Sequence, residues 1–159
     1  MSLTPSLSQP IIEALYSEAL VLADDVRAVF AQGALSPEPE PGLTPHDDAM
    51  ARLALSTEGL KTTTRIMHVL AWLLNQRAFF SGELSSRQVR LHGTLPLDRP
   101  SDADQLARLE PETRELIAET ERLHRRIARL DDAWRQNFEM GASPARAFQE
   151  RIGRELGGL

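Results

Sequence analysis

The sequence has four histidines and no cysteine, so imidazole is the side chain best suited to bind a metal or transfer a proton. His68 lies in an apolar stretch and has no second ligand three or four residues away, the spacing that one helix face needs. His46 precedes Asp47 and Asp48, but acidic residues in that position are typical of a helix N-terminus. We therefore expect no metal site.

A run of three threonines, Thr62 to Thr64, precedes Arg65 and is a candidate for anion binding or phosphorylation. Threonine hydroxyls inside a helix usually donate to a carbonyl one turn earlier, or the residues pack as small side chains. The run lies in the middle of a long helical pattern. It therefore predicts packing rather than anion binding.

Four arginines cluster near the C-terminal third of the chain: Arg122, Arg125, Arg126 and Arg129. Acidic residues precede them at i,i+3 and i,i+4 spacing, the favourable order for ion pairs along a helix. An ion-paired, solvated face is the simplest interpretation, and a partner-docking surface is the alternative. Together with the apolar residues Phe148 and Ile152, these arginines are the candidate docking residues.

No pattern in the sequence supports enzymatic chemistry. It contains no glycine-rich phosphate loop, no nucleophile elbow and no paired carboxylates of the kind that catalysis uses. We therefore expect a protein that is not an enzyme and that needs no cofactor and no small-molecule substrate.

Composition narrows the class further. The 159 residues are 42% hydrophobic and 26% charged, as in an ordinary globular domain. No run of 18 apolar residues occurs, and residues 1–5 lack the basic start of a secretory signal, so we expect a cytoplasmic protein with no membrane partner. The net charge of −5 disfavours general nucleic-acid binding, although residues 62–99 carry five arginines against two acids.

The candidate residues must be positioned by helices, because periodicity and capping signals indicate an all-α fold. A first helix is predicted from Ser8 to Gly33. Its apolar stripe is Ile12, Leu15, Ala19, Leu22, Val26 and Val29. A Pro/Glu linker (34–43) follows, and residues 1–9 are expected to be flexible.

The central helix is predicted from Thr44 to Ser81, about 37 residues or roughly 55 Å. Thr44 caps it, Pro45 takes the first helical position, and Gly59 is the expected kink. We expect a short helix from Ser85 to His92 and a loop (93–104) in which Ser101 and Asp104 cap another short helix.

The third main helix is predicted from Pro111 to about Glu139, which places one helical domain over residues 10–140. Its expected buried stripe is Leu116, Thr120, Leu123, Ile127, Leu130 and Trp134. The tail (141–159) reads as a short amphipathic helix.

The central helix carries two apolar stripes where a surface helix normally carries one. A heptad stripe comprises Met50, Leu53, Thr57, Leu60, Thr64, Met67, Ala71, Leu74 and Ala78. The other stripe comprises Ile66, Val69, Leu70, Leu73 and Phe80, and we expect it to form a dimer interface. Two stripes exceed what two shorter helices can cover, so the pattern predicts a three-helix bundle that forms a homodimer. The alternative is a monomer in which the short helix and the tail helix cover the second stripe.

Residues 56–84 resemble the core helix of the RcdA family (regulator of CtrA degradation) of alphaproteobacteria. The matching positions are Thr63, Thr64, Arg65, Met67, Trp72, Leu73, Leu74, Gln76, Arg77 and Ala78, then Gly82 and Glu83. The resemblance implies a dimeric three-helix bundle. It also implies an adaptor that delivers cell-cycle regulatory proteins to the ClpXP protease, with that protease system and its substrates as partners.

The alternative is a small helical DNA-binding regulator. It rests on the locally basic region 62–99 and on Arg87 and Arg90 in the predicted short helix. A helix-turn-helix needs two short helices joined by a brief turn, and the long preceding helix does not suit that geometry.

Overall fold

A computed structural model describes residues 8–35, 41–141 and 152 of the chain. Within these ranges the protein is all-α and contains no strand, as predicted. The helices are α1 (Gln9–Leu35), α2 (Pro45–Phe80), α3 (Ser86–His92), α4 (Ala103–Leu106) and α5 (Pro111–Gly141). None of the helices in the described ranges is long and apolar enough to cross a membrane.

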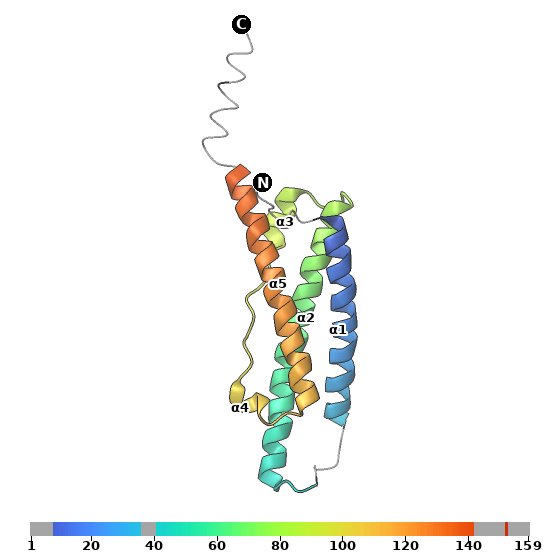
Figure 1. Cartoon of the computed structure of the whole chain (residues 1–159), viewed down its shortest axis with the longest axis vertical. Coiled ribbons are helices and arrows are strands. Elements are labelled where there is room, and N and C mark those ends of the chain that lie inside the picture. The colour runs from blue at the N-terminus through green and yellow to red at the C-terminus, as the bar shows by residue number, and fades with distance from the viewer. Residues whose placement is uncertain (1–7, 36–40, 142–151, 153–159) are drawn as a thin grey trace.

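The three long helices lie side by side, with α2 between α1 and α5 (Figure 1). α1 runs antiparallel to α2 and α5, because the chain reverses after α1 and the segment between α3 and α4 runs back along the bundle before α5 begins. α3 lies at one end of this layer, and α4 lies against α2 toward the other end. α2 is therefore the element on which all the others pack.

Local sequence signals explain where α2 begins and ends. The Thr44 hydroxyl oxygen accepts a hydrogen bond from the Asp47 N–H at 3.1 Å, Pro45 opens the helix, and Asp47 and Asp48 lie in its first turn. Gly82 adopts a φ of 82° just beyond the helix, a conformation that side chains other than glycine disfavour. Both ends agree with the prediction.

α2 is one continuous helix through Gly59, where the sequence predicts a kink. Gly59 is also a point of close approach to α1. A Cβ atom at this position would lie 2.8 Å from Cδ1 of Phe30, closer than van der Waals contact allows. The missing side chain lets the Phe30 ring lie against the backbone of α2.

The short elements also follow capping chemistry, with one correction. Ser85 and Gln88 form the predicted capping box of α3. The cap of α4 is Asp102, whose carboxylate accepts from the N–H groups of Asp104 and Gln105, and not Ser101 or Asp104. The first helix also passes Gly33 and ends at Leu35.

The core lies between the three long helices and matches the predicted stripes of the first and third. On α1 the residues from Ile12 to Val26 of the stripe are buried, and Val29 packs against them. On α5 the stripe is buried except for Leu130, which packs against the core. A smaller cluster of Ala54, Leu109 and Ile117 lies near α4, where Leu106 joins it. The linker (34–43) is described only in part, and the N-terminal segment and tail lie mostly outside the described residues.

Candidate interaction surfaces

The residues that we expected to form the dimer interface belong to the core of one chain. Ile66, Val69 and Leu73 are at most 3% exposed, and Leu70 and Phe80 pack against the same cluster. The prediction for this stripe is therefore wrong. The physical reason is that α1 and α5 both pack on this side of α2, so a single chain already covers it.

The heptad stripe lies on the opposite side of α2, facing away from α1 and α5. Leu53, Leu60, Met67 and Leu74 recur every seven residues and are 55%, 70%, 62% and 48% exposed. Every exposed position of α2 from residue 53 to residue 74 is uncharged. These positions, which we call the uncharged α2 face, are Leu53, Ser56, Leu60, Thr63, Thr64, Met67, Ala71 and Leu74.

The residues of the family-like motif on α2 divide between this face and the interior. Thr63, Thr64, Met67 and Leu74 are exposed, whereas Arg65, Trp72, Leu73 and Gln76 are buried. Two of the buried members, Arg65 and Gln76, are polar, and Arg65 and Trp72 form hydrogen bonds to other parts of the chain. The motif is thus a structural one at its buried positions.

Arg65 ties α2 to two distant segments. Its Nε lies 2.8 Å from both carboxylate oxygens of Asp98, and its guanidinium also donates to the carbonyl of Arg99 at 3.0 Å and to the Thr120 hydroxyl at 3.1 Å. Arg65 is only 1% exposed. A buried charge is tolerated when it is paired and its donors are satisfied, and this arrangement meets both conditions.

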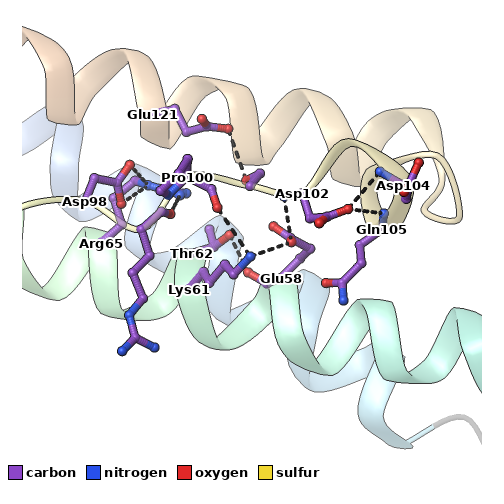
Figure 2. Close-up of polar contacts among 12 residues, drawn as sticks. Glu58, Lys61, Thr62, Arg65, Asp98, Pro100, Asp102, Asp104, Gln105 and Glu121 are labelled. Atoms are coloured by element: carbon purple, nitrogen blue, oxygen red, sulfur yellow. Dashed lines mark hydrogen bonds and ion pairs between the residues drawn. The ribbon is translucent and has the colours of Figure 1, made fainter.

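One and two turns before Arg65 on α2, Lys61 and Glu58 hold the segment that connects α3 to α4 (Figure 2). Glu58 is fully buried, and its Oε1 accepts from Lys61 and from the Asp102 N–H, both at 3.1 Å. Lys61 also donates to the carbonyl of Pro100 at 3.3 Å, and Ser101 donates to Glu121 of α5. The segment 93–102 is thereby held to both α2 and α5.

The other end of segment 93–102 is held by α5. The Leu95 N–H donates to Asp131, which also accepts from Trp72 Nε1 at 3.0 Å. His124 Nε2 lies 3.2 Å from the carbonyl of Pro96, so this nitrogen carries the proton. Between these anchors Leu97 is 95% exposed. Four buried residues of α2 and α5 therefore hold this connecting segment: Glu58, Arg65, His124 and Asp131.

Arg77 and Gln76 complete the motif in different ways. Arg77 stacks over Tyr16 at 4.3 Å, and its hydrogen bond of 2.8 Å to Glu13 raises the pKa of the guanidinium. Gln76 is fully buried, and neither its amide nitrogen nor its amide oxygen has a hydrogen-bond partner in the described structure. An unsatisfied buried amide costs stability.

The four candidate docking arginines lie together on one wall of a groove between α1 and α5, with a volume of about 550 Å³. We call this the arginine groove. The α5 wall comprises Glu119, Arg122, Leu123, Arg125, Arg126 and Arg129, and the α1 wall comprises Glu18, Val21, Leu22 and Asp25. Phe148 lies outside the described residues, and Ile152 is 40% exposed.

Sequence reasoning found the arginine wall but missed the opposite one. Glu18, Val21 and Asp25 follow each other at helical spacing beside the core stripe of α1, and that periodicity was the available signal. Asp98 and Asp131 were also missed. Their partners lie 33 and 59 residues away in sequence, and no local pattern reveals such pairs.

The other candidate sites do not assemble. Within the described residues no group of three histidine, aspartate or glutamate side chains is placed to hold a metal ion. Thr44 and Arg52 instead engage Asp47 and Asp48. Thr62 donates to the carbonyl of Glu58 at 2.7 Å, the back-bonding expected inside a helix.

The geometry of α3 does not match a helix-turn-helix. α3 has seven residues and exposes Arg87 and Arg90, but an extended segment rather than a second helix follows it. The next helix, α4, has four residues and packs on α2. No recognition helix is therefore offered by this part of the chain.

Comparison with known proteins gives a family but no described activity. Searches of curated proteins and of solved structures find no match. A family model, described as "Protein of unknown function (DUF1465)", matches residues 3–156. The chain therefore belongs to the DUF1465 family.

Proposed function

We propose that this protein is a non-enzymatic adaptor that works as a homodimer of three-helix bundles. In this role it brings cell-cycle regulatory proteins to the ClpXP protease in the cytoplasm. The observation that carries the proposal is the uncharged α2 face, an exposed side of the central helix that has no charged residue between Leu53 and Leu74.

The uncharged α2 face is suited to contact with another copy of itself. Leucine or methionine recurs every seven residues, and Thr57, Thr64, Ala71 and Ala78 occupy the intervening heptad positions. Large residues at one heptad position and small residues at the other allow two such helices to pack closely. A two-fold axis through this face buries the same patch on both subunits.

A second surface remains available when the α2 face is covered. The arginine groove lies between α1 and α5, whereas the residues of the uncharged face are exposed on α2 and line no part of that groove. An adaptor needs at least two surfaces that can be occupied at once. The separation of these two surfaces supports that role.

The choice of ClpXP as the protease rests on the resemblance of residues 56–84 to the RcdA family. The exposed part of the motif, including Met67 and Leu74, lies in the self-association face, and its buried part holds the fold together. The match thus concerns the scaffold. Adaptor activity must be measured with the partner proteins themselves.

The test is a reconstituted degradation assay. Purified ClpXP from the same organism is incubated with candidate cell-cycle regulators, with and without the full-length protein. We expect at least one regulator to be degraded faster in its presence. Unchanged degradation of every candidate, together with no co-elution with protease or regulator, would contradict the adaptor role.

A matched pair of variants connects this assay to the structure. Leu60→Glu with Met67→Glu places charge on the uncharged α2 face, whereas Leu91→Glu with Leu97→Glu places the same charge on exposed leucines elsewhere. We expect only the first pair to change the rate. If the two variants change the degradation rate equally, the adaptor activity does not depend on the uncharged α2 face.

A further inference from the structure

The arginine groove has two walls of different character and an apolar base. Arg125 and Arg129 stand on the α5 wall, and Asp25 stands on the α1 wall. We propose that the groove binds an amphipathic helix of a partner protein, with acidic residues along the edge that faces α5. This deepens the proposed adaptor role, on which it rests for its biological meaning.

The arginines of the groove that have no ion pair determine where the docked helix needs acidic residues. Arg122 forms an ion pair with Glu115 at 2.7 Å. Arg126 of α5 forms an ion pair with Glu18 of α1 at 2.6 Å. Within the described residues no ion pair engages Arg125 or Arg129, and both side chains are exposed. They lie four residues apart, about 6 Å along α5. Two acidic residues one turn apart on a docked helix match that separation.

The base of the groove sets the apolar stripe. Leu22 and Leu123 form it, each at most 7% exposed, and Val21 is 64% exposed on the rim. Because Leu22 and Leu123 are almost covered by their own core, a helix placed there would bury its apolar side mainly on Val21 and on the aliphatic parts of the arginine side chains. The α5 wall extends from residue 119 to residue 129, about 15 Å, which corresponds to roughly three turns of the docked helix.

The acidic residues of the α1 wall argue against a nucleic acid as the ligand of the groove. A nucleic-acid backbone carries negative charge along its whole length and needs a broad cationic surface. Here the arginines face Glu18 and Asp25 across the groove. A second copy of the chain is also a poor match through its uncharged α2 face, which has no acidic residue to offer. A helix with one acidic edge suits both walls.

The experiment uses two synthetic 16-residue helical peptides with the same leucine stripe. One carries glutamates along a single edge, and its twin carries lysines at those positions. Because the chain has no cysteine, Ala28→Cys provides one exposed attachment site for an environment-sensitive fluorophore on α1, three residues beyond the lining residue Asp25. Thr94→Cys provides a control site that is not part of the groove lining. We expect the acidic peptide to bind about tenfold more tightly than its twin and to change the fluorescence more at position 28 than at position 94.

Charge reversal provides the decisive comparison. Arg125→Glu with Arg129→Glu should weaken the acidic peptide about tenfold and make the lysine peptide the better ligand. Arg87→Glu with Arg114→Glu changes the net charge equally outside the groove and should leave the preference intact. Circular dichroism melts show whether each variant is folded.

Three results would overturn the inference: no binding of the acidic peptide at millimolar concentration, the same preference in both charge-reversed proteins, or binding of duplex DNA in preference to the peptide. The degradation assay reports separately on the adaptor role. Groove binding without any effect on degradation would leave this inference standing and remove the protease function. If the Arg125→Glu, Arg129→Glu variant still stimulates degradation, the adaptor role stands and does not depend on the groove.

Discussion

At the scale of single residues, the chain keeps several charged and amide groups away from water. Arg65 and Glu58 are buried on α2, and both hold segment 93–102. Taking a charge out of water costs several kcal/mol, which is offset only by pairing and hydrogen bonding. We therefore expect that removing a partner of one of these buried residues lowers stability more than a substitution at an ordinary surface position.

Asp98→Ala tests this for Arg65. The change leaves the buried guanidinium with two hydrogen bonds but no counter-charge, so we expect the free energy of unfolding to fall by about 3 kcal/mol. Urea denaturation measures the loss. Adding Arg65→Met should recover part of it, because the unpaired charge is then gone. The exposed Asp132→Ala serves as control, and an equally small effect at Asp98 would contradict the buried-pair interpretation.

Gln76 offers the opposite case, a polar side chain whose removal should help. Gln76→Met keeps the length of the side chain and eliminates two unsatisfied buried groups, so we expect a gain of about 1 kcal/mol. The midpoint of urea unfolding should rise, while the exposed Gln136→Met should leave it unchanged. A lower midpoint would mean that the amide has a partner, such as a buried water molecule.

At the scale of elements, helix positions could be predicted from sequence far better than helix partners. Thr44, Ser85 and Gly82 are local signals, because each acts on backbone groups within a few residues, and the elements they bound appear where expected. The two stripes of α2 were equally local. Which stripe faces α1 and α5 depends on packing between distant helices, and periodicity carries no information about that.

Gly59 shows how a contact between elements reverses a local expectation. Gly59→Ala should favour the helix by up to about 1 kcal/mol from propensity alone. The new methyl group, however, would collide with the Phe30 ring, and overpacking typically costs about 1–3 kcal/mol. We expect a net loss of stability, measured by thermal or urea unfolding.

A double-mutant cycle isolates that contact. If the ring is the obstacle, Gly59→Ala should cost less in a Phe30→Leu background than in the natural sequence. Strict additivity of the two changes would show that Phe30 and Gly59 do not interact. A stabilising Gly59→Ala would show that propensity outweighs the contact.

At the scale of the whole molecule, the position of α2 explains why its outer face is exposed. α1 and α5 cover one side of the central helix, and α3 and α4 pack against α2 toward its two ends. The arginine groove arises from the same arrangement, because α1 and α5 pack on α2 more than on each other. The docking arginines were predictable from their clustering, whereas the acidic wall opposite them required the fold.

The uncharged α2 face makes a direct prediction about the mass of the protein in solution. We expect light scattering to give twice the 17.7 kDa of one chain, because burying the four large apolar residues of this face on a second copy removes them from water. Leu60→Glu with Met67→Glu should return the mass to that of one chain, since two acidic residues from each subunit would then face each other. Leu91→Glu with Leu97→Glu should not.

Cross-linking locates the two-fold axis on this face. Thr64 lies near the middle of the stretch from Leu53 to Leu74, so Thr64→Cys in one chain should meet Thr64→Cys in the other and form a disulfide under mild oxidation. Thr94→Cys, exposed on segment 93–102, should remain reduced at the same protein concentration. A mass of one chain at high concentration, or equal cross-linking at both positions, would rule out self-association through α2. The exposed stripe would then be free for a partner of another kind.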